Sequence, residues 1–323
     1  MASEPEETGG DGPRAPWRAP MLATLVEAPS WLRQGRSGWI FERKLDGLRC
    51  LAVRNGDRVD LWSRNHKSFN ARFPDVAGAL AGLAVDNFTL DGELVAFDGQ
   101  DFLGFGALQE HASRLVVVYC VFDVLHLLGR DTRGLPLDDR KRLLGGVVDR
   151  SAHLRPVEAL SGDPGALLES ACAARWEGLV AKRGDGPYIP GRSADWCKLK
   201  CTASQELVIG GWTDPHGARS GFGALLVGYY EGDQLRFAGK VGTGFSVATI
   251  TSLSSELRRL GRPESPFADA VTERRVHWVE PALVANLAFS EWTRDGRLRH
   301  PRFEGLRSDK DPKTVVREQP PRP

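Results

Sequence analysis

The chain changes character near residue 200, and this change constrains its fold more than any other feature of the sequence. Beyond Lys200, short alternating apolar runs surround one clear helical stretch, Ser246–Leu260. The runs that predict strands here are Glu206–Trp212, Ala224–Tyr230, Leu235–Val241, Val276–Val279 and Leu283–Thr293. Five short strands with one helix are typical of a small β-barrel of the OB type. We therefore expect an OB-fold domain over residues 204–316.

The part before residue 200 mixes strands with helices. Asn55-Gly56 separates two alternating runs and is a strong hairpin signal. Leu137–Val148, which follows a proline, and Ala166–Ala174 both read as helices. The predicted strands are Trp39–Arg43, Leu48–Arg54, Arg58–Trp62, Phe88–Phe97, Leu115–Leu125, Leu179–Lys182 and Trp196–Lys200. This is an α+β pattern with antiparallel sheets, and we expect it to form one domain over residues 19–203.

The two ends of the chain differ from these domains in composition. Residues 1–18 and 317–323 are rich in Glu, Gly and Pro, so we expect disordered tails. The acidic N-terminus does not resemble a signal peptide, and no apolar run is long enough to span a membrane. The five cysteines form no C-x-x-C pair, which indicates a reducing compartment and no structural zinc. We expect a cytoplasmic protein.

The charge balance limits the partners of the chain. There are 43 Lys and Arg residues against 42 Asp and Glu, so the net charge is +1. This excludes a uniformly basic surface for nucleic acid, but it leaves room for a local basic groove.

Lys44 is the first residue that suggests chemistry. It ends a predicted strand, and Asp46-Gly47 turns the chain directly after it, so the amine points away from a sheet edge. A lysine is a nucleophile only when it is deprotonated, and burial near other cations lowers its pKa. The alternative is an ordinary charged turn between two strands.

Two carboxylates enter apolar strands. Glu93 lies within the run Leu90–Phe97, and Glu177 opens the run Gly178–Arg183. A carboxylate among apolar residues is costly unless it is paired or bound to a metal. Two carboxylates from different strands suit Mg²⁺, although each alone could be a surface residue at a strand end.

Two groups of cations suit phosphate. At a period of two, Lys198 and Lys200 lie on one face of a strand, and an anion between them would relieve their repulsion. The stretch His300–Asp311 is basic and can bind a polyphosphate or a nucleic-acid backbone. Taken singly, the first group is also typical of a solvated edge strand and the second of a solvated charged face.

Together, in this order, these stretches resemble a known family. KLDGLR, LDGELVAF, VFDVL, EGLVAKR, DWCKLK and RSDKD resemble six motifs of the covalent nucleotidyltransferases, and more narrowly of the ATP-dependent DNA ligases. The segments PMLA, YIPGRSADWCKLK, GKVGTGF and GLRSDKDP are most similar to the ligase module of bacterial non-homologous end-joining ligases. The resemblance runs from about Pro20 to Val316, and it implies an adenylation domain followed by the OB-fold domain.

The resemblance implies roles for residues around the nucleotide. Lys44 matches the nucleophile that becomes lysyl-AMP, and Glu42 matches the position beside adenine. Arg49 matches the residue that touches the ribose, Phe122 the aromatic ring that stacks on the base, and Arg64 a residue that contacts phosphate. His66, two residues later, departs from the family, which usually has Gly there, and this puts the local turn in doubt.

Further roles concern metal and phosphate. By similarity, Glu93 contacts the ribose and, with Glu177, the metal, while Lys198 and Lys200 contact the α-phosphate. The last motif, which orients pyrophosphate in the first step, is matched by Arg307, Asp309 and Lys310.

The resemblance therefore implies an ATP-dependent DNA ligase that uses Mg²⁺ or Mn²⁺ and seals nicked or broken duplex DNA in repair. It also implies a monomer that associates with the nucleoid when it is bound to DNA and uses a Ku-like DNA-end-binding partner. Only 43 residues precede Lys44, so we expect no separate N-terminal DNA-binding domain. The alternatives are an RNA ligase, a GTP-using capping-type enzyme, and a DNA-end-binding module that has lost catalysis. The last alternative predicts a damaged motif, yet the nucleophile, both carboxylates and both strand lysines are present.

Overall fold

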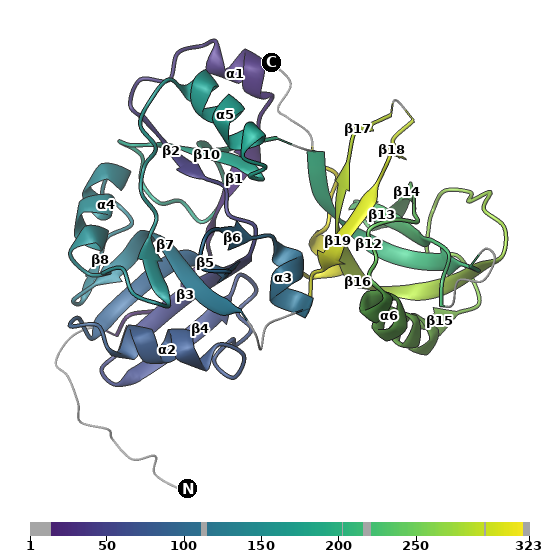
Figure 1. Cartoon of the computed structure of the whole chain (residues 1–323), viewed down its shortest axis with the longest axis horizontal. Helices are drawn as coiled ribbons and strands as arrows, with labels where there is room; N and C mark the ends of the chain where they lie inside the picture. The colour runs from purple at the N-terminus through teal and green to yellow at the C-terminus, as the bar shows by residue number, and fades with distance from the viewer. Residues whose placement is uncertain (1–13, 111–114, 202, 216–220, 294, 319–323) are drawn as a thin grey trace, which may run out of the picture. The chain divides into compact units, whose positions relative to one another are not determined.

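The structure is a computed structural model that describes residues 14–110, 115–201, 203–215, 221–293 and 295–318 (Figure 1). The chain divides into two compact units, Met1–Leu199 and Lys200–Pro323. Each unit encloses its own hydrophobic core.

The N-terminal unit contains a large, mainly antiparallel sheet in the order β4-β3-β5-β7-β8, with β6 paired to β5 and β9 to β7. Its strands are β3 (Leu48–Asn55), β4 (Arg58–Ser63), β5 (Asn87–Phe97), β6 (Phe102–Leu103), β7 (Val116–Leu127), β8 (Arg130–Asp131) and β9 (Leu154–Pro156). Asn55 lies opposite Arg58, and Gly56 between them has a φ of +62°. The predicted hairpin is confirmed, and glycine supplies the left-handed conformation that its turn needs.

Helices cover this sheet. They are α2 (Pro74–Ala81), α3 (Phe105–Glu110) and α4 (Leu137–Gly145), and α2 contacts β4, β7 and β9. The core under α2 includes Leu80 and Phe88, each fully buried, and such burial contributes about 1.5–3 kcal/mol per side chain. The predicted helix from Leu137 ends at Gly145 rather than Val148, because two successive glycines are poor helix formers.

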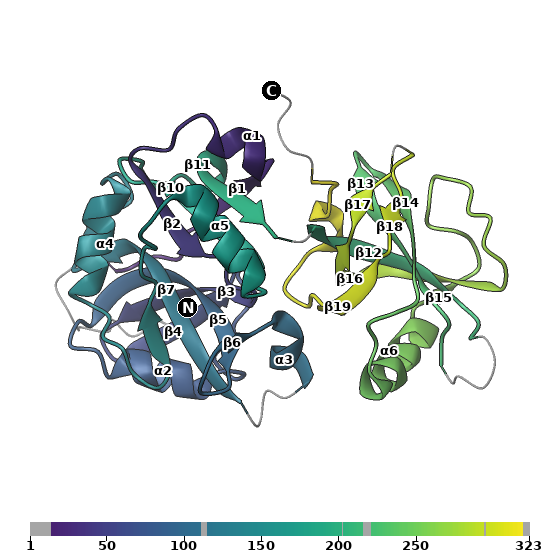
Figure 2. The same cartoon turned by 45° about the horizontal axis from the view of Figure 1, so that its top comes forward.

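A second sheet of four strands has the order β1-β11-β10-β2. Its elements, with two neighbouring helices, are β1 (Met21–Leu25), α1 (Ala28–Leu32), β2 (Trp39–Arg43), α5 (Pro164–Ala173), β10 (Gly178–Arg183) and β11 (Gly191–Lys200). Helix α5 contacts both α1 and β10 (Figure 2). It begins two residues before the predicted start, because the Asp163 side chain accepts a hydrogen bond from the Ala166 amide and caps it.

An apolar cluster joins the two sheets. Met21 and Trp196 come from the smaller sheet, Leu51 and Phe122 come from the larger one, and Tyr188 lies in the connection before β11. Phe122 and Tyr188 each meet Trp196 edge to face, with ring centroids 5.9 and 5.7 Å apart. The residues on either side of this cluster are therefore held in a fixed relation.

Part of the predicted N-terminal tail packs on the large sheet. Residues 1–13 lie outside the described residues, but Ala15 exchanges hydrogen bonds of 2.7 and 3.1 Å with the Asn55 side chain. The Thr89 hydroxyl donates to the Pro16 carbonyl at 2.8 Å. The sequence of residues 14–18 did not predict these contacts, because they depend on side chains far along the chain.

The turn at His66 explains why glycine suits this position. His66 has a φ of +57°, a conformation that costs a non-glycine residue about 1–2 kcal/mol. Its ring lies 4.5 Å from that of Trp17 and 4.3 Å from that of Trp62. Aromatic contacts on both sides offset the strain, so the turn is kept without glycine.

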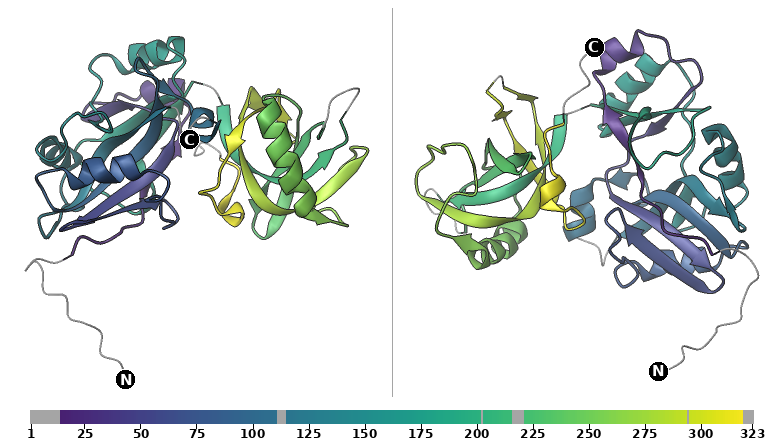
Figure 3. Two further views of the ribbon diagram at one scale, coloured as in Figure 1. Left: turned by 60° about the horizontal axis from the view of Figure 1, so that its bottom comes forward. Right: turned by 180° about the vertical axis from the view of Figure 1, so that it is seen from behind.

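The C-terminal unit is built around a sheet in the order β14-β13-β12-β16-β15, with β19 paired to β16, and one long helix. Figure 3 shows α6 lying against the strands of this unit. The elements are β12 (Ala203–Thr213), β13 (Leu225–Glu231), β14 (Gln234–Val241), α6 (Val247–Arg259), β15 (Gly261–Arg262), β16 (Val276–Phe289), β17 (Glu291–Trp292), β18 (Leu298–Arg299), β19 (Arg302–Leu306) and the 3-10 helix η1 (Pro312–Thr314).

Two runs of this unit that were predicted as separate strands form one continuous strand. The runs Val276–Val279 and Leu283–Thr293 join in β16, which passes through Pro281 but ends at Phe289, before the predicted end at Thr293. A register shift opposite Ile209–Gly211 of β12 accommodates the proline, which cannot donate a ladder hydrogen bond. Arg317 and Glu318 were expected in the C-terminal tail, but this end of the chain packs on the C-terminal unit. The Glu318 amide donates to the Gln205 side chain at 2.9 Å.

Candidate active site

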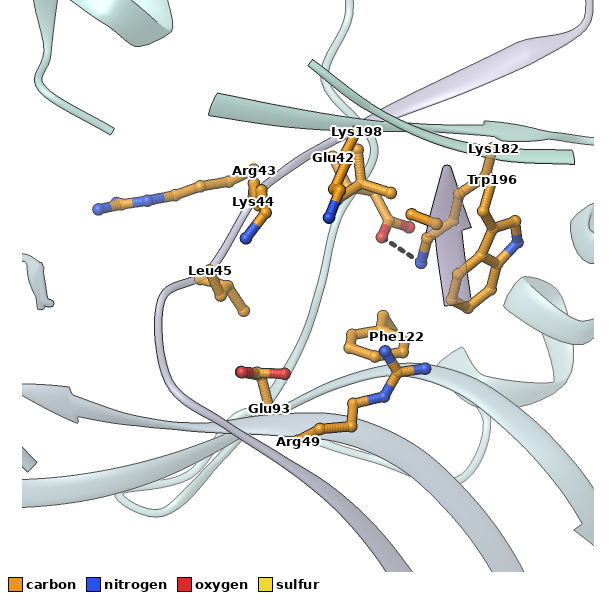
Figure 4. A pocket seen from close by; sticks show the side chains of 12 residues that line it. Glu42, Arg43, Lys44, Leu45, Arg49, Glu93, Phe122, Lys182, Trp196 and Lys198 are labelled. Carbon is orange, nitrogen blue, oxygen red and sulfur yellow. Dashed lines mark ion pairs between the residues drawn. The ribbon is translucent and has the colours of Figure 1, made fainter. Parts of the chain in front are cut away.

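A cavity opens between the two sheets of the N-terminal unit (Figure 4). Strands β1, β2, β3, β5, β7, β10 and β11 all contribute to its wall. The residues that line it are Ala23, Glu42, Arg43, Lys44, Leu45, Arg49, Glu93, Phe122, Val180, Lys182, Trp196 and Lys198. Six predicted site residues therefore share one cavity, although up to 156 positions separate them in the sequence.

Lys44 follows the last residue of β2, and its amide donates to the Gly178 carbonyl at 2.9 Å. Its ammonium forms an ion pair with Glu177, so this second carboxylate is joined to the cavity through the lysine. Burial alone would lower the pKa of Lys44, but Glu177, with smaller contributions from Asp46 and Glu93, raises it above the ordinary value. In this state the amine is protonated and is not a nucleophile.

Gly47 allows the chain after Lys44 to run close to β5. A Cβ atom at this position would lie 2.2 Å from the Leu94 carbonyl oxygen and 3.1 Å from Cγ of Glu93. Any larger residue would push this loop away from β5, and with it the lysine from the carboxylate. The Asp-Gly pair is therefore required by the close approach of the two segments, beyond its use as a turn.

A buried charge network forms the inner end of the cavity. Glu42 pairs with Lys182 at 2.6 Å and with Lys141 of α4, and the side chains of Glu42 and Lys182 are only 2% exposed. The Lys182 ammonium lies 4.2 Å from the ring centroids of both Phe122 and Trp196. Burial lowers the pKa of Lys182 to about 8, while the two ammonium groups outweigh the effect of burial on Glu42 and lower the pKa of that carboxyl.

Arg49 reaches the cavity from β3 and lies beneath Phe122 (Figure 4), with its guanidinium carbon 4.6 Å from the ring centroid. Its Nε and Nη2 atoms each donate to Asp91 at 2.6 Å. In the antiparallel register, Arg49 is directly opposite Glu93 of β5. The cavity thus carries a cation and a carboxylate side by side on the larger sheet.

The remaining predicted site residues lie elsewhere. Arg64 is in the turn after β4 and does not line the cavity. The Lys200 ammonium donates to the carbonyl and hydroxyl of Ser204 at 2.6 and 3.0 Å. The last predicted group forms contacts within the C-terminal unit: the Arg307 guanidinium donates to Asp309 at 2.9 and 3.0 Å, and Lys310 pairs with Glu206 at 3.2 Å.

Six residues of the cavity were not predicted as site residues, and three of them have charged or aromatic side chains, namely Arg43, Lys182 and Trp196. Lys182 lies in the motif that supplied Glu177, and Trp196 lies in the motif that supplied Lys198 and Lys200. A usable signal for Lys182 was a lysine inside the apolar run of β10, where a buried charge needs a partner. Nothing in the sequence identifies Glu42 as that partner.

The carboxylates are compatible with a divalent cation. Within the described residues, no three His, Cys, Asp or Glu side chains cluster as a complete metal site. Mg²⁺ needs only one or two carboxylates when phosphate and water supply its other ligands. Glu93 and Glu177 both raise the pKa of Lys44, so both carboxylates lie near the position where phosphates would have to bind. Of the helices in the described parts of the chain, none is long and apolar enough to cross a membrane.

Comparisons with known proteins agree over nearly the whole chain. Residues 20–200 match the family model described as "ATP dependent DNA ligase domain", and residues 218–310 match "ATP dependent DNA ligase C terminal region". The chain is 38% identical to the multifunctional non-homologous end joining protein LigD of Pseudomonas aeruginosa, over 97% of this chain and 38% of that protein. It is 39% identical to the LigD protein of Mycobacterium tuberculosis, over 93% of this chain and 40% of that protein.

A solved structure is also similar. A mycobacterial DNA ligase D complexed with ATP and MES is 36% identical, covers 93% of this chain and 98% of its own, and gives a TM-score of 0.66. The chain spans about two fifths of the length of the two LigD proteins.

Proposed function

The chain belongs to the ATP-dependent DNA ligases, and from this premise we propose that it seals breaks between a 5′-phosphate and a 3′-hydroxyl in duplex DNA by way of a lysyl-AMP. The observation that carries the proposal is the position of Lys44, whose amine lies at a cavity lined by Glu42, Arg49, Phe122 and Lys198. Such a cavity provides a stacking ring, cations for phosphates and one nucleophile.

In the first step, the neutral amine of Lys44 attacks the α-phosphorus of ATP. A P–N bond forms, the bond from the α-phosphorus to the bridging oxygen breaks, pyrophosphate leaves with the electron pair, and one proton of the attacking amine goes to solvent. Lys198 lines the cavity, so its ammonium can stabilise the charge that develops on the α-phosphate. Since Glu177 holds the proton on Lys44, this carboxylate has to be engaged elsewhere before the amine can attack.

Glu177 and Glu93 would hold a divalent cation, Mg²⁺ or Mn²⁺, which when bound would neutralise charge on the phosphates. In the second step, a 5′-phosphate oxygen of DNA attacks the phosphorus of lysyl-AMP and releases the amine. In the third, the 3′-hydroxyl attacks the DNA phosphorus, its proton goes to solvent, and AMP leaves. The roles that the resemblance implies for the other site residues remain predictions. These residues are Arg64, Lys200, Arg307, Asp309 and Lys310.

The base would be read by the buried charge network. Adenine presents an amino donor at N6 and an acceptor at N1, which suit the Glu42 carboxylate and the Lys182 ammonium. Guanine presents the opposite pattern, a carbonyl at O6 and a donor at N1, so both groups would oppose it. A site with paired buried groups rejects the wrong base strongly, because a mismatch leaves those groups without partners.

Lys182→Met is therefore expected to reduce the preference for ATP over GTP by at least about fivefold, since each lost pairing is worth roughly 1–3 kcal/mol. Glu42 keeps Lys141 as a counter-ion, so the variant should remain folded. Initial rates of adduct formation over a range of ATP and GTP concentrations measure the ratio. Lys240→Met, which removes an exposed lysine of the C-terminal unit, is the matched control. An unchanged ratio in Lys182→Met would remove Lys182 from base recognition.

We also propose that the chain acts in end joining in the cytoplasm, as a monomer or with a DNA-end-binding partner. The names of the LigD relatives support the pathway, although the chain spans only part of each of them. A Ku-like partner and the preference for Mg²⁺ or Mn²⁺ are parts of the same proposal. The alternatives based on RNA or GTP draw no support from any similar protein named above.

The proposal is tested by incubating the protein with α-labelled ATP or GTP and a divalent cation, followed by a denaturing gel and intact mass measurement. We expect a covalent AMP adduct from ATP that is released by nicked DNA as the nick is sealed. An adduct from GTP alone would favour capping chemistry, and preferential sealing of nicked RNA would favour an RNA ligase. If the protein carried no AMP either before or after incubation, we would instead conclude that the chain is a non-catalytic DNA-end-binding module.

A further inference from the structure

A closed ring of hydrogen bonds lies behind Arg49. The Tyr188 hydroxyl donates to Oδ2 of Asp91 at 2.6 Å and accepts from the Met21 amide at 2.8 Å. Asp91 accepts from Nε and Nη2 of Arg49, and Nη2 also donates to the Met21 carbonyl at 3.2 Å. The ring thus joins strands β1, β3 and β5 to the connection before β11.

The ring is buried on the side away from the cavity. The Asp91 side chain is 0% exposed, and its two oxygens accept three hydrogen bonds. Burial also raises the pKa of Tyr188 well above its ordinary value, so the hydroxyl remains a donor at neutral pH. Because charge-assisted hydrogen bonds are strong in a buried setting, this arrangement fixes the plane of the Arg49 guanidinium.

The cavity side of Arg49 is different. Within the described residues, no hydrogen bond is made by its Nη1 atom, while Nε and Nη2 are both used by the ring. The guanidinium lines the cavity beneath Phe122. A ligand that stacks on Phe122 would therefore contact an arginine whose orientation is already fixed by its hydrogen bonds to Asp91 and to the Met21 carbonyl.

We propose that Tyr188 is a positioning residue for the nucleotide: through Asp91 its hydroxyl holds the Arg49 guanidinium in the orientation that binds ATP. The inference rests on the proposed function, since it takes ATP as the ligand of the cavity. It also gives a purpose to Met21 of the segment PMLA and Tyr188 of the segment YIPG, neither of which lines the cavity itself. A fixed guanidinium lowers the entropy that is lost on binding, so its effect is on affinity more than on chemistry.

The test is Tyr188→Phe, which removes one oxygen and keeps the ring that packs against Trp196. We expect the KM for ATP in adduct formation to rise about tenfold, which corresponds to about 1.4 kcal/mol, with kcat within about threefold of the parent. Asp91→Asn is a second variant that acts on the same ring of bonds, and it should raise the KM in the same direction if Tyr188→Phe does not fold.

Two comparisons separate positioning from a structural role. Tyr119→Phe is the matched control, because the Tyr119 hydroxyl is equally buried but donates to the carbonyls of Cys50 and Leu90. It should lower stability without changing the KM for ATP. In an Arg49→Gln background, Tyr188→Phe should raise the KM no further, because the residue through which it acts is gone.

An unchanged KM in Tyr188→Phe, an equal rise in Tyr119→Phe, or full additivity with Arg49→Gln would each overturn the inference. These results are distinct from failure of the proposed function. If the parent protein formed no AMP adduct and carried no AMP before treatment, the proposed function and this inference would both fall. If the parent formed the adduct and the KM did not respond, only the role of Tyr188 would fall.

Discussion

Lys44→Ala is expected to abolish covalent transfer of AMP to the protein, with a loss of at least about a thousandfold in rate. The reason is that no other lysine of the cavity can replace it: Lys182 is buried against Glu42 and two aromatic rings, and Lys198 is proposed to contact the phosphate it would have to attack. The measurement is intact mass and labelled-AMP incorporation over time.

The same variant should keep its fold and part of its sealing activity. The Lys44 and Glu177 side chains are about one fifth exposed, and partly solvated pairs contribute only about 1 kcal/mol or less. Closure of a nick that is already adenylated does not require the amine, so this reaction is expected to survive in part. A normal rate of adduct formation in Lys44→Ala would show that another residue is the nucleophile.

The family and fold class were predictable because motifs place chemistry at fixed points of local structure. The run around Lys44 combines a strand end with an Asp-Gly turn, and the structure has β2 ending at Arg43, directly before the lysine. The α+β architecture followed by an OB-fold-like unit is confirmed, as is the resemblance to ligases of end joining. Element ends were less predictable, since the start of α5 depends on a side-chain cap and the length of β16 on a register shift.

The network behind the cavity could not be predicted from the sequence. Glu42 and Lys182 are 140 positions apart, and they meet only because β2 and β10 pair with Val180 opposite Glu42. Tyr188 reads as one aromatic residue in a turn-rich segment until the fold brings its hydroxyl to Asp91. Alternation along β11 predicted one common face for Lys198 and Lys200, and both are half-buried around the buried Leu199. The bond from Lys200 to Ser204 could not be predicted from this alternation.

Arg140→Met is expected to lower the free energy of unfolding by about 3–5 kcal/mol, the usual cost of removing one partner of a buried ion pair. Arg140 and Asp123 are both 0% exposed and are joined by hydrogen bonds of 2.7 and 3.0 Å. The substitution would leave a carboxylate in the core without its cation. Urea unfolding of the variant and the parent measures the difference. Arg259→Met, which breaks an exposed pair with Glu256, is the control and should change stability by less than about 1 kcal/mol.

This pair also supports the cavity, so its loss should affect the nucleotide site before the protein unfolds. Asp123 directly follows Phe122 in β7, and Arg140 donates to the Gly186 carbonyl at 3.1 Å, two residues before Tyr188. Replacing both partners in Asp123→Leu/Arg140→Met should recover part of the stability, because no buried charge is left unpaired. It should not recover the affinity for ATP to the same degree, since the segment that carries Tyr188 would still lack its anchor. A drop of less than about 1 kcal/mol in Arg140→Met, or recovery of stability and ATP affinity in parallel, would contradict this account.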